Sequence, residues 1–216
     1  MNTTTISNIS KERSTEAMKA RYQLHAKVYD LTCWSFLFGR KKIIRMLAAK
    51  NPTARRILEV GCGTGYNLKK LGNQFPLTQV IGMDVSPKML QKARKNTTVF
   101  GNRIQLIEQP YTFGDMKFNA KMDMILFSYA LTMINPQWEE LIAQTAYDLK
   151  HGGLIAVVDF YDSRFQWFKN HMGNNHVRMD GHLTPVLKRH FQTEHEQVRK
   201  AYGGVWQYFT YIGRKA

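Results

Sequence analysis

Several residue types and patterns are scarce in this chain, and each absence excludes a class of protein. The 216 residues include only two cysteines, Cys33 and Cys62, too few for a disulfide framework or a cysteine-based zinc site. No apolar run approaches the roughly 18 residues that a membrane-spanning helix needs. The first ten residues are polar and do not resemble a secretory signal. These absences, with the modest length, predict one cytoplasmic domain in a reducing compartment.

Acidic residues are also scarce, and their distribution is uneven. The chain has 31 Lys and Arg against 16 Asp and Glu, a formal charge of +15. Residues 57–159 hold 10 basic and 9 acidic side chains, whereas residues 1–56 hold 12 and 3, and residues 160–216 hold 9 and 4. The excess charge therefore lies in the two flanks, which indicates an anionic partner such as a membrane surface or nucleic acid. Solvated lysines that serve solubility are the simpler alternative.

The most informative segment is residues 57–67, ILEVGCGTGYN. A short apolar strand containing Glu59 runs into three glycines at alternate positions and then into a helix. Glycine tolerates positive φ and lets the backbone pass close to a ligand, and the helix start offers unpaired N–H groups. A second strand, residues 79–84, ends in Asp84. An acid at that point can hold both hydroxyls of a ribose, so the segment predicts a nucleoside site.

The details of this segment restrict which nucleoside it binds. A dinucleotide fingerprint needs glycine at position 66, where Tyr66 stands, and no G-K-[ST] phosphate loop exists. Glu59 would repel a pyrophosphate but attract a cationic amino-acid group. The pattern resembles the E-x-G-x-G-x-G motif of class I S-adenosylmethionine (SAM)-dependent methyltransferases. The resemblance implies SAM as cofactor and S-adenosylhomocysteine as product.

The rest of the chain predicts an α/β, doubly wound, Rossmann-like fold. Helices are expected at about 65–71, after the Ser86-Pro87 cap, and after an Asn135-Pro136 cap, the last carrying Leu141, Ile142 and Leu149 and ending at Gly152-Gly153. Strands are expected at 56–60, 79–84, 104–107, 122–127 and 154–160, followed by a hairpin of 194–201 and 205–213 around 202–204. The family resemblance implies the strand order 3-2-1-4-5-7-6, with strand 7 antiparallel.

The N-terminal region is expected to add a tail and a lid to this single domain. We predict a disordered tail over residues 1–10 and a helix over about 11–30, then an aromatic segment at 31–39 and a basic helix from residue 40. Rings beside a basic helix resemble an interfacial membrane element. A lid packed over the cofactor is an equally weighted interpretation, and the two are compatible. The expected division is 1–50 for tail and lid and 51–216 for the SAM-binding domain, with residues 11–56 facing an anionic membrane.

By the family resemblance, the glycines Gly61, Gly63 and Gly65 support the methionine part of SAM. Glu59 would hold its ammonium group, Asp84 the ribose, and Val85 and Met89 the adenine. Many relatives place an acid after strand three, but here Glu108 stands one position early. The other expected cofactor contacts are Tyr29, Arg40, Asn67, Gln109, Pro110, Tyr111, Phe127 and Ser128.

The loop after strand four meets the transferring methyl group in this fold, which makes Tyr129 a candidate for orienting the nucleophile. Asp159, at the end of strand five, is a candidate for holding a cationic amine. Tyr129 could instead be a ring that closes the sheet, and Asp159 could cap local backbone. Expected substrate contacts are Tyr22, Met133, His176 and Arg178. The C-terminal histidines match no metal-binding spacing, so no metal is expected.

A closer resemblance covers nearly the whole chain from residue 20. Segments similar to bacterial lipid N-methyltransferases, especially those that trimethylate diacylglyceryl-homoserine, are HAKVYDLT (25–32), FGR (38–40), GCGTGYN (61–67), SYALTMI (128–134), VDF (158–160) and AYGGVW (201–206). The resemblance implies N-methylation of an amine on a lipid headgroup by a cytoplasmic protein peripheral to the inner membrane face. Tyr29 and Arg40 would close over the methionine end of SAM.

Three alternatives stay open at this point. The first is a methyltransferase for a soluble small-molecule amine or hydroxyl. The second is an RNA methyltransferase, which would show salt-dependent RNA affinity. The loop after strand four lacks the [Asp/Asn/Ser]-Pro-Pro-aromatic motif of enzymes that methylate exocyclic base amines, and neither cysteine lies in a loop that would suit C5 chemistry. The third is a SAM-binding subunit without catalytic activity.

Overall fold

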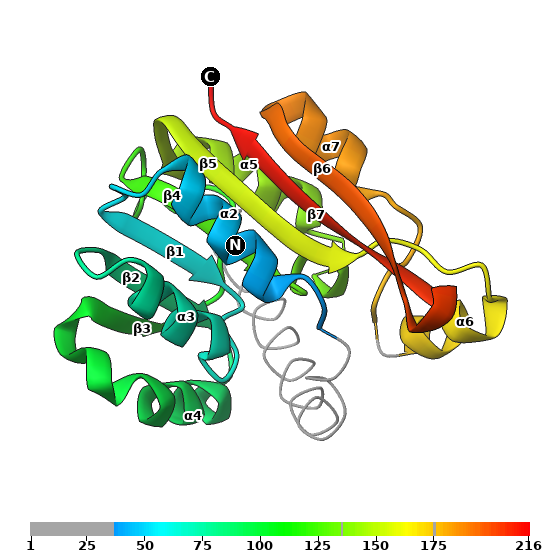
Figure 1. The fold of residues 1–216 in the computed structure, drawn as a ribbon, viewed down its shortest axis with the longest axis horizontal. Coiled ribbons are helices and arrows are strands. Elements are labelled where there is room, and N and C mark those ends of the chain that lie inside the picture. Colours follow the sequence, from blue (N-terminus) through cyan, green and yellow to red (C-terminus); the bar gives the residue numbers. More distant parts are fainter. Residues whose placement is uncertain (1–36, 135, 175) are drawn as a thin grey trace, which may run out of the picture.

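The computed structural model describes residues 37–134, 136–174 and 176–216. These residues form a seven-stranded sheet with helices around it (Figure 1). The strand order is β3-β2-β1-β4-β5-β7-β6, and β7 is antiparallel to both of its neighbours. The order and the antiparallel seventh strand are as predicted. The strands are β1 (Arg56–Val60), β2 (Gln79–Asp84), β3 (Ile104–Glu108), β4 (Met122–Ser128), β5 (Leu149–Phe160), β6 (Gln192–Ala201) and β7 (Trp206–Arg214).

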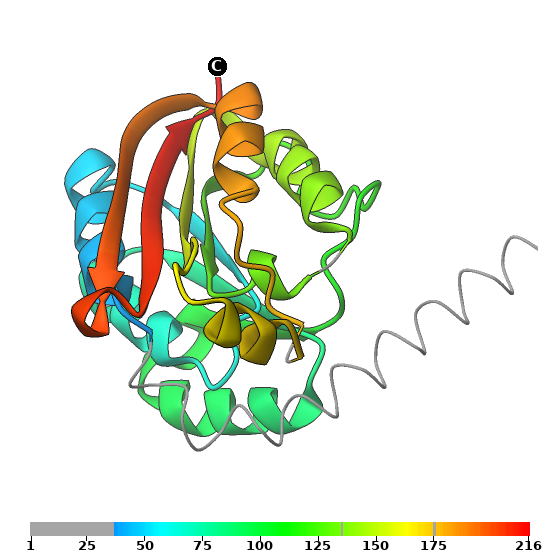
Figure 2. The ribbon, with the colours of Figure 1, turned by 90° about the vertical axis from the view of Figure 1, so that its right-hand side faces the viewer.

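Helices cover both faces of the sheet (Figures 1 and 2). One layer holds α2 (Arg40–Lys50), α3 (Tyr66–Gln74) and α4 (Pro87–Thr97), and the other holds α5 (Trp138–Asp148) and α7 (Leu183–His190). The strands alternate between the layers, because successive side chains point to opposite faces: Ile57 belongs to the first core and Leu58 to the second. The remaining elements are α6 (Gln166–Asn174) and the short 3-10 helices η2 (Thr98–Arg103), η3 (Leu131–Met133) and η4 (Tyr202–Gly204).

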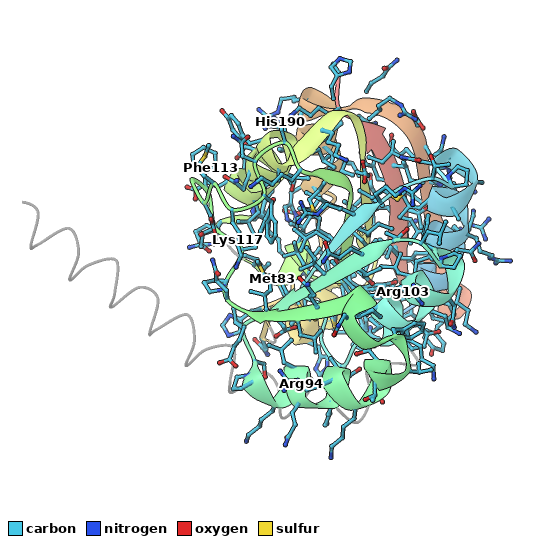
Figure 3. All side chains as sticks on the ribbon, turned by 90° about the vertical axis from the view of Figure 1, so that its left-hand side faces the viewer. Met83, Arg94, Arg103, Phe113, Lys117 and His190 are labelled. Atoms are coloured by element: carbon cyan, nitrogen blue, oxygen red, sulfur yellow. The ribbon has the colours of Figure 1, made fainter. Side chains whose placement is uncertain are left out.

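Residues of the central strands lie mostly in the core, whereas several residues of the connections between strands lie at the surface. Met83 of β2 is buried, whereas Phe113 and Lys117, on the connection between β3 and β4, are exposed (Figure 3). The parallel strands β1, β2, β4 and β5 all end at one edge of the sheet. Ligands of open α/β sheets bind at this edge, so it is where the site residues should gather.

Local signals predicted some element ends well and others poorly. Ser86 caps α4 as expected, because its side chain accepts from the backbone N–H of Met89 at 3.4 Å and Pro87 follows. The cap predicted at Asn135-Pro136 is wrong, because Gln137 is the residue that precedes the first turn of α5. Asn135 itself lies outside the described residues.

The boundary between α5 and β5 also differs from the prediction. Leu149 begins β5 rather than ending the helix, and Gly152-Gly153 lies within the strand. Met122 pairs with Leu149 whereas Met124 pairs with Leu154, so β5 bulges between these two registers. Gly152 has a φ of +72° inside this bulge. A glycine pair can stop a helix or allow a bulge, and the pairing with β4 decided for the bulge.

Helix α2 packs on the sheet rather than presenting an apolar face to solvent. Its apolar side chains Ile43, Ile44 and Leu47 are buried in the core with α3 and β5. For residues 40–50 this agrees with a packed helix, while Lys41 and Arg45 stay exposed, so contact of the basic face with a membrane stays a prediction. The predicted tail, the helix at 11–30, Tyr22, Tyr29 and Cys33 lie outside the described residues. Within the described ranges, none of the helices is both long and apolar enough to cross a bilayer.

Candidate active site

The glycine-rich loop between β1 and α3 is held in place by backbone contacts with β2. The N–H groups of Gly61 and Cys62 both donate to the carbonyl of Met83, at 2.9 and 3.0 Å. Gly61, Gly63 and Gly65 have φ values of +70°, +52° and +79°, which favour glycine. At Gly65 a Cβ atom would lie 3.1 Å from the backbone Cα of Ala93, so close packing against α4 also requires glycine there. The loop is therefore a bare stretch of main chain at the sheet edge.

Asp84 closes this loop from the end of β2. One carboxylate oxygen accepts from the N–H of Gly63 at 2.8 Å and the other from the N–H of Ser86 at 2.9 Å. Burial raises the pKa of Asp84, and these backbone donors oppose the rise. Each oxygen keeps a lone pair beyond the bond it accepts. Two adjacent ribose hydroxyls could donate to the pair of oxygens, as the sequence predicts.

Glu59 is the second acid of the site and is almost fully buried, at 1% exposure. Its Oε1 accepts from the side-chain amide of Asn67 at 2.7 Å, while its Oε2 and the Oδ1 of Asn67 have no partner in the described chain. Burial raises the pKa of Glu59 to about 8, against the effects of Asn67 and the Arg40 charge. An unpartnered buried acceptor costs about 1–3 kcal/mol. An ammonium group would satisfy both oxygens, so these residues fit the amino-acid end of SAM.

Arg40 lies at the same edge, although it comes from the start of α2. Its guanidinium stacks over the Tyr66 ring with the Cζ atom 4.1 Å from the ring centroid, and its Nε donates to the carbonyl of Leu37 at 3.2 Å. Its charge also lowers the pKa of Glu59. The fold therefore brings Arg40 close to the glycine loop, as the resemblance implied. Its contact with the cofactor stays a prediction.

The residues predicted to contact adenine divide into two groups. Val85 is half-buried and Met89 is buried at the turn into α4, next to Asp84. Gln109 instead donates through its side chain to Asp115 at 2.7 Å, and the Tyr111 hydroxyl donates to Asp148 at 2.7 Å.

The Tyr111 ring also packs edge-on against Phe127 in the core shared with α5, and Pro110 beside it is half-buried. The polar ends of Gln109 and Tyr111 thus have other partners. Contact with adenine stays a prediction for Gln109, Pro110 and Tyr111. Contact with the cofactor stays a prediction for Phe127.

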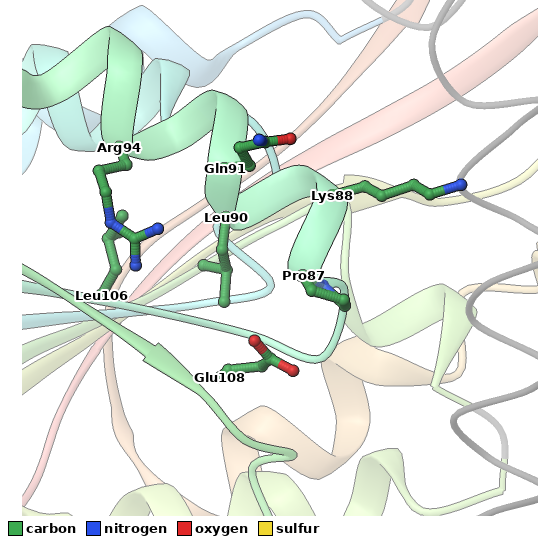
Figure 4. Close-up of a pocket in the computed structure, with 7 residues that line it drawn as sticks. All are labelled: Pro87, Lys88, Leu90, Gln91, Arg94, Leu106 and Glu108. Carbon is green, nitrogen blue, oxygen red and sulfur yellow. The ribbon is translucent and has the colours of Figure 1, made fainter.

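A cavity of about 400 Å³ opens at the sheet edge between α4 and β3 (Figure 4). The Glu108 carboxylate and the Leu90 side chain project into it from opposite elements (Figure 4). It is lined by Pro87, Lys88, Leu90, Gln91, Arg94, Leu106 and Glu108. Neither Glu59 nor the glycine loop contributes to its wall. The cavity therefore lies beside the predicted adenine region, and Glu108 is the acid nearest to the position that relatives use.

Tyr129 occupies a strained position just after β4. Its φ is +55°, uncommon for a residue with a side chain, and its backbone N–H donates to Val158 at 2.8 Å. Its hydroxyl donates to the carbonyl of Phe38 at 2.9 Å, and its ring lies edge-on to Phe160 at 4.8 Å. Strain of this kind clusters at functional sites. The preceding residue, Ser128, has a buried hydroxyl without a partner in the described chain.

Asp159 has contacts that favour the backbone-capping alternative. It is fully buried and accepts from the Thr132 hydroxyl at 2.5 Å, the Thr132 N–H at 3.3 Å and the Phe160 N–H at 2.9 Å. Burial raises its pKa to about 6, although these donors lower it. Asp159 thus fastens η3, which follows β4, to the end of β5. A direct contact with substrate stays a prediction.

The predicted substrate residues lie around the same loop. Met133 is half-buried against the first core, and His176 is exposed with a φ of +61°. The N–H of Arg178 donates to the carbonyl of Thr132 at 3.0 Å, and its guanidinium pairs with Asp180 at 2.8 Å. The fold therefore brings Arg178 to the loop after β4, although its charge is already paired.

Sequence reasoning missed a pair formed by Asp180 and His182 next to this loop, which we call the Asp180–His182 dyad. His182 Nδ1 lies 2.5 Å from Asp180 Oδ1, and the His182 ring lies edge-on to Trp138 at 4.6 Å. Its Nε2 is buried and has no partner in the described chain. The only available signal was the R-x-D-x-H spacing of residues 178–182. That spacing is uninformative without knowing which nitrogen is left free.

Comparison with known proteins supports the fold and matches part of the chain to one family. Residues 57–153 match the family profile described as "Methyltransferase domain". A demethylmenaquinone methyltransferase of Tropheryma whipplei is 30% identical over 158 residues, which are 70% of this chain and 62% of that protein. Matches to three curated relatives, including this one, cover 39% to 62% of the relatives' lengths. The chain thus spans less than two thirds of each of these relatives.

Solved structures extend the likeness over almost the whole chain. The 1,6-didemethyltoxoflavin-N1-methyltransferase of Burkholderia thailandensis, with bound S-adenosylhomocysteine, has a TM-score of 0.72 at 16% identity. The match covers 94% of this chain and 90% of that one. N-methyltransferase NodS of Bradyrhizobium japonicum has a TM-score of 0.69 at 16% identity, covering 90% of this chain and 98% of the other. Identities this low establish the fold alone. The chain therefore has the class I methyltransferase fold and, in residues 57–153, a match to the methyltransferase-domain family.

Proposed function

We propose that this protein is a SAM-dependent methyltransferase that binds the cofactor at the edge where β1, β2 and β4 end. The observation that carries the proposal is the buried Glu59 carboxylate with one oxygen unpartnered. Beside it lies a loop of positive-φ glycines, and Asp84 faces the same loop. An ammonium group and a ribose diol complement these two acids. A pyrophosphate has no hydrogen to donate to either carboxylate and would be repelled by their ionised forms, which argues against a dinucleotide.

The residues of the chain would bind and position more than they would react. SAM supplies a methyl group on a sulfonium, so the acceptor needs a free lone pair held in line in a dry pocket. Glu59 and Asp84 would fix the two ends of the cofactor, and Arg40 and Tyr29 would close over the methionine end. Ser128 and Tyr129, at the end of β4, would face the methyl group.

Calorimetry with SAM and with NADH tests the cofactor assignment directly. We expect S-adenosylhomocysteine to displace SAM and NADH to give no heat of binding. Binding of NADH in place of SAM would overturn the proposal. A protein that binds SAM firmly and transfers no methyl group to any extract would instead be a non-catalytic SAM-binding subunit.

The acceptor we propose is the amine of a lipid headgroup, similar to diacylglyceryl-homoserine. Support comes from the resemblance of six segments to lipid N-methyltransferases and from the basic flanks of a nearly neutral centre. The basic side chains would bring the enzyme to an anionic membrane, each contributing about 1 kcal/mol near the surface. The proposed membrane contact of the N-terminal region is residues 11–56, which include the exposed Lys41 and Arg45 of α2.

A soluble small-molecule acceptor is the second candidate, and the name of one relative supports it. The relatives are named for trans-aconitate, malonyl-[acyl-carrier protein] and demethylmenaquinone, of which the first is a soluble small molecule and none is a lipid-headgroup amine. Incubation with radiolabelled SAM and a total lipid extract, in parallel with a water-soluble metabolite extract, separates the candidates. Label in a lipid supports the first and label in the soluble fraction the second. Label in added RNA would support neither.

A further inference from the structure

The segment between α6 and α7 holds a histidine whose chemistry the cofactor site does not use. The His182 side chain is 7% exposed, although it pairs with a carboxylate that is 43% exposed. Its ring packs against Trp138, the first residue of α5. The pairing leaves one ring nitrogen, Nε2, buried and without a partner in the described chain. A buried polar atom without a partner in a native fold calls for an explanation.

The identity of the free nitrogen follows from its neighbours. Asp180 accepts from the Arg178 side chain and from the N–H of His182, and these contacts and the imidazole lower its pKa. An ionised carboxylate can only accept, so Nδ1 of His182 must carry the hydrogen of the 2.5 Å contact. Burial lowers the pKa of His182, which makes the neutral ring the resting form at neutral pH. Neutral His182 therefore keeps its lone pair on Nε2.

The fold places this dyad beside the loop where methyl transfer would occur. The N–H of Arg178 bonds the carbonyl of Thr132 in η3, and the N–H of Gly181 bonds the carbonyl of Tyr161 just after β5. The segment 178–182 is thus fastened to the loops that follow β4 and β5. Ala130, two residues before Thr132, lies close to Gly61 of the glycine loop. A Cβ atom added to Gly61 would be 3.0 Å from the Cβ atom of Ala130. Short contacts therefore lead from the glycine loop to the dyad.

We infer that His182 is the base that takes a proton from the methyl acceptor and that Asp180 holds its ring in the required tautomer. The inference rests on the proposed function. An amine acceptor is an ammonium ion at neutral pH and has no lone pair to donate. Transfer of one proton from the ammonium to Nε2 frees that lone pair and forms an imidazolium, which Asp180 stabilises. The nitrogen then bonds the methyl carbon, the carbon–sulfur bond breaks, and its electron pair stays on sulfur.

The other charged groups near His182 do not compete for this role. Arg178 lowers the pKa of His182 and Asp180 raises it, both from its own segment. On α5, Glu139 pairs with Arg189 of α7 at 2.7 Å. Asp159, which bonds Thr132 of η3, is buried, and its carboxylate accepts three hydrogen bonds from Thr132 and Phe160. His182 is thus the group of this cluster that combines a neutral resting form with a free lone pair.

Kinetics over a pH series test the inference. The assay uses wild type, His182→Gln and Asp180→Asn, with radiolabelled SAM and a soluble short-chain diacylglyceryl-homoserine. We expect His182→Gln to lower kcat about 100-fold or more, to leave SAM affinity unchanged, and to lose the acidic limb of the kcat/KM profile. Added imidazole should restore part of the rate. Asp180→Asn should lower kcat about tenfold, because the Nδ1–H loses its anionic partner.

The matched control is His190→Gln, an exposed histidine at the outer end of α7, far from α4 (Figure 3). It should behave as wild type. If His182→Gln only lowered the thermal midpoint and kept the wild-type pH profile, His182 would be a packing residue and the inference would fail. A wild type that transfers no methyl group to any acceptor would instead sink the proposed function.

A measurement that needs no acceptor keeps the inference falsifiable on its own. Nitrogen-15 NMR of the histidines at pH 7, with S-adenosylhomocysteine bound, reports which ring nitrogen carries hydrogen. Comparison with His182→Gln assigns the signal. We expect hydrogen on Nδ1 alone. Hydrogen on Nε2, or on both nitrogens, would remove the lone pair and overturn the assignment.

Discussion

The candidate site has a cofactor half and an acceptor half, and the two are built in different ways. In the cofactor half, Glu59, the glycine loop and Asp84 come from one βαβ unit, and hydrogen bonds within that unit hold them together. In the acceptor half, Thr132, Asp159 and residues 178–182 come from three separate segments. The Asp159 side chain bonds Thr132, and backbone N–H groups of residues 178–182 bond the loops after β4 and β5. The first half therefore depends on one local unit and the second on contacts between distant segments. Substitutions should separate the two halves.

The largest effect is expected for Asp84→Ala. The change removes the predicted ribose contact and also leaves the N–H groups of Gly63 and Ser86 without their acceptor. SAM affinity should fall about 100-fold or more, because two charge-assisted hydrogen bonds would be lost. Calorimetry measures the affinity and circular dichroism checks that the fold survives. Glu140→Gln, at an exposed acid of α5, is the control and should change the affinity less than threefold. Unchanged SAM binding in Asp84→Ala would show that the ribose is placed wrongly.

Glu59→Gln should remove the pH dependence of folding stability that the buried Glu59 carboxyl group causes. The folded pKa of Glu59, about 8, exceeds the ordinary 4.5, so the native state prefers the protonated form. The ligand-free protein should therefore lose stability as pH rises from about 4.5 to 8, by on the order of a few kcal/mol. Urea unfolding of the wild type should show this slope, and Glu59→Gln should lack it.

The same acid predicts how cofactor binding depends on pH. A cationic ammonium group binds the ionised carboxylate, so the SAM affinity of the wild type should rise between pH 6 and 8. In Glu59→Gln it should be at least about tenfold weaker and independent of pH over that range. An equal pH slope in both proteins would mean that Glu59 does not hold the ammonium group.

Two glycine substitutions distinguish backbone conformation from packing in the cofactor loop. Gly65→Ala combines a φ of +79° with a Cβ 3.1 Å from the Ala93 backbone, and should cost about 2–3 kcal/mol of stability. Gly63→Ala has a φ of +52° and open space around its Cβ, so it should cost only about 1 kcal/mol. Urea titrations of both variants measure the difference. Equal losses would contradict the close packing of Gly65 on α4.

Tyr129→Phe should give the smallest effect and probes the junction between the two halves. It leaves the Phe38 carbonyl without its tyrosine donor, which should cost about 1 kcal/mol of unfolding free energy. SAM affinity should not change, because the ring keeps its place against Phe160. A loss of kcat larger than tenfold with unchanged stability would favour a direct role in methyl transfer.

Prediction from the sequence worked best where a motif is local. Glu59 is next to last in β1 and Asp84 ends β2, both in strands with a clear apolar pattern, and parallel strands bring such ends together. It worked less well where a residue could serve two structures. Gly152-Gly153 fits a helix stop and a bulge equally, and only the pairing of β5 with β4 decided between them. Tyr111 follows β3 as expected, but its hydroxyl turns to Asp148 on α5, a partner that no spacing indicates.

The basic helix α2 shows a related ambiguity. Its sequence contains an apolar stripe and a cationic face, which suit a membrane surface and a packed helix alike. In the structure α3 and β5 bury Ile43, Ile44 and Leu47, which agrees with the packed helix, and membrane contact of the cationic face stays a prediction. An amphipathic pattern specifies that one face leaves water. The pattern alone does not specify what covers that face.

By itself, the sequence determined the α/β class and the two acids beside a glycine turn, since each depends on residues near one another in the chain. The strand order was predicted through the family resemblance. Only the tertiary structure decided that Glu59 keeps one oxygen free, that Asp159 fastens a loop, and that His182 keeps a lone pair on Nε2. Those properties depend on which partners a buried polar atom finds, and the partners come from strands and loops far apart in sequence.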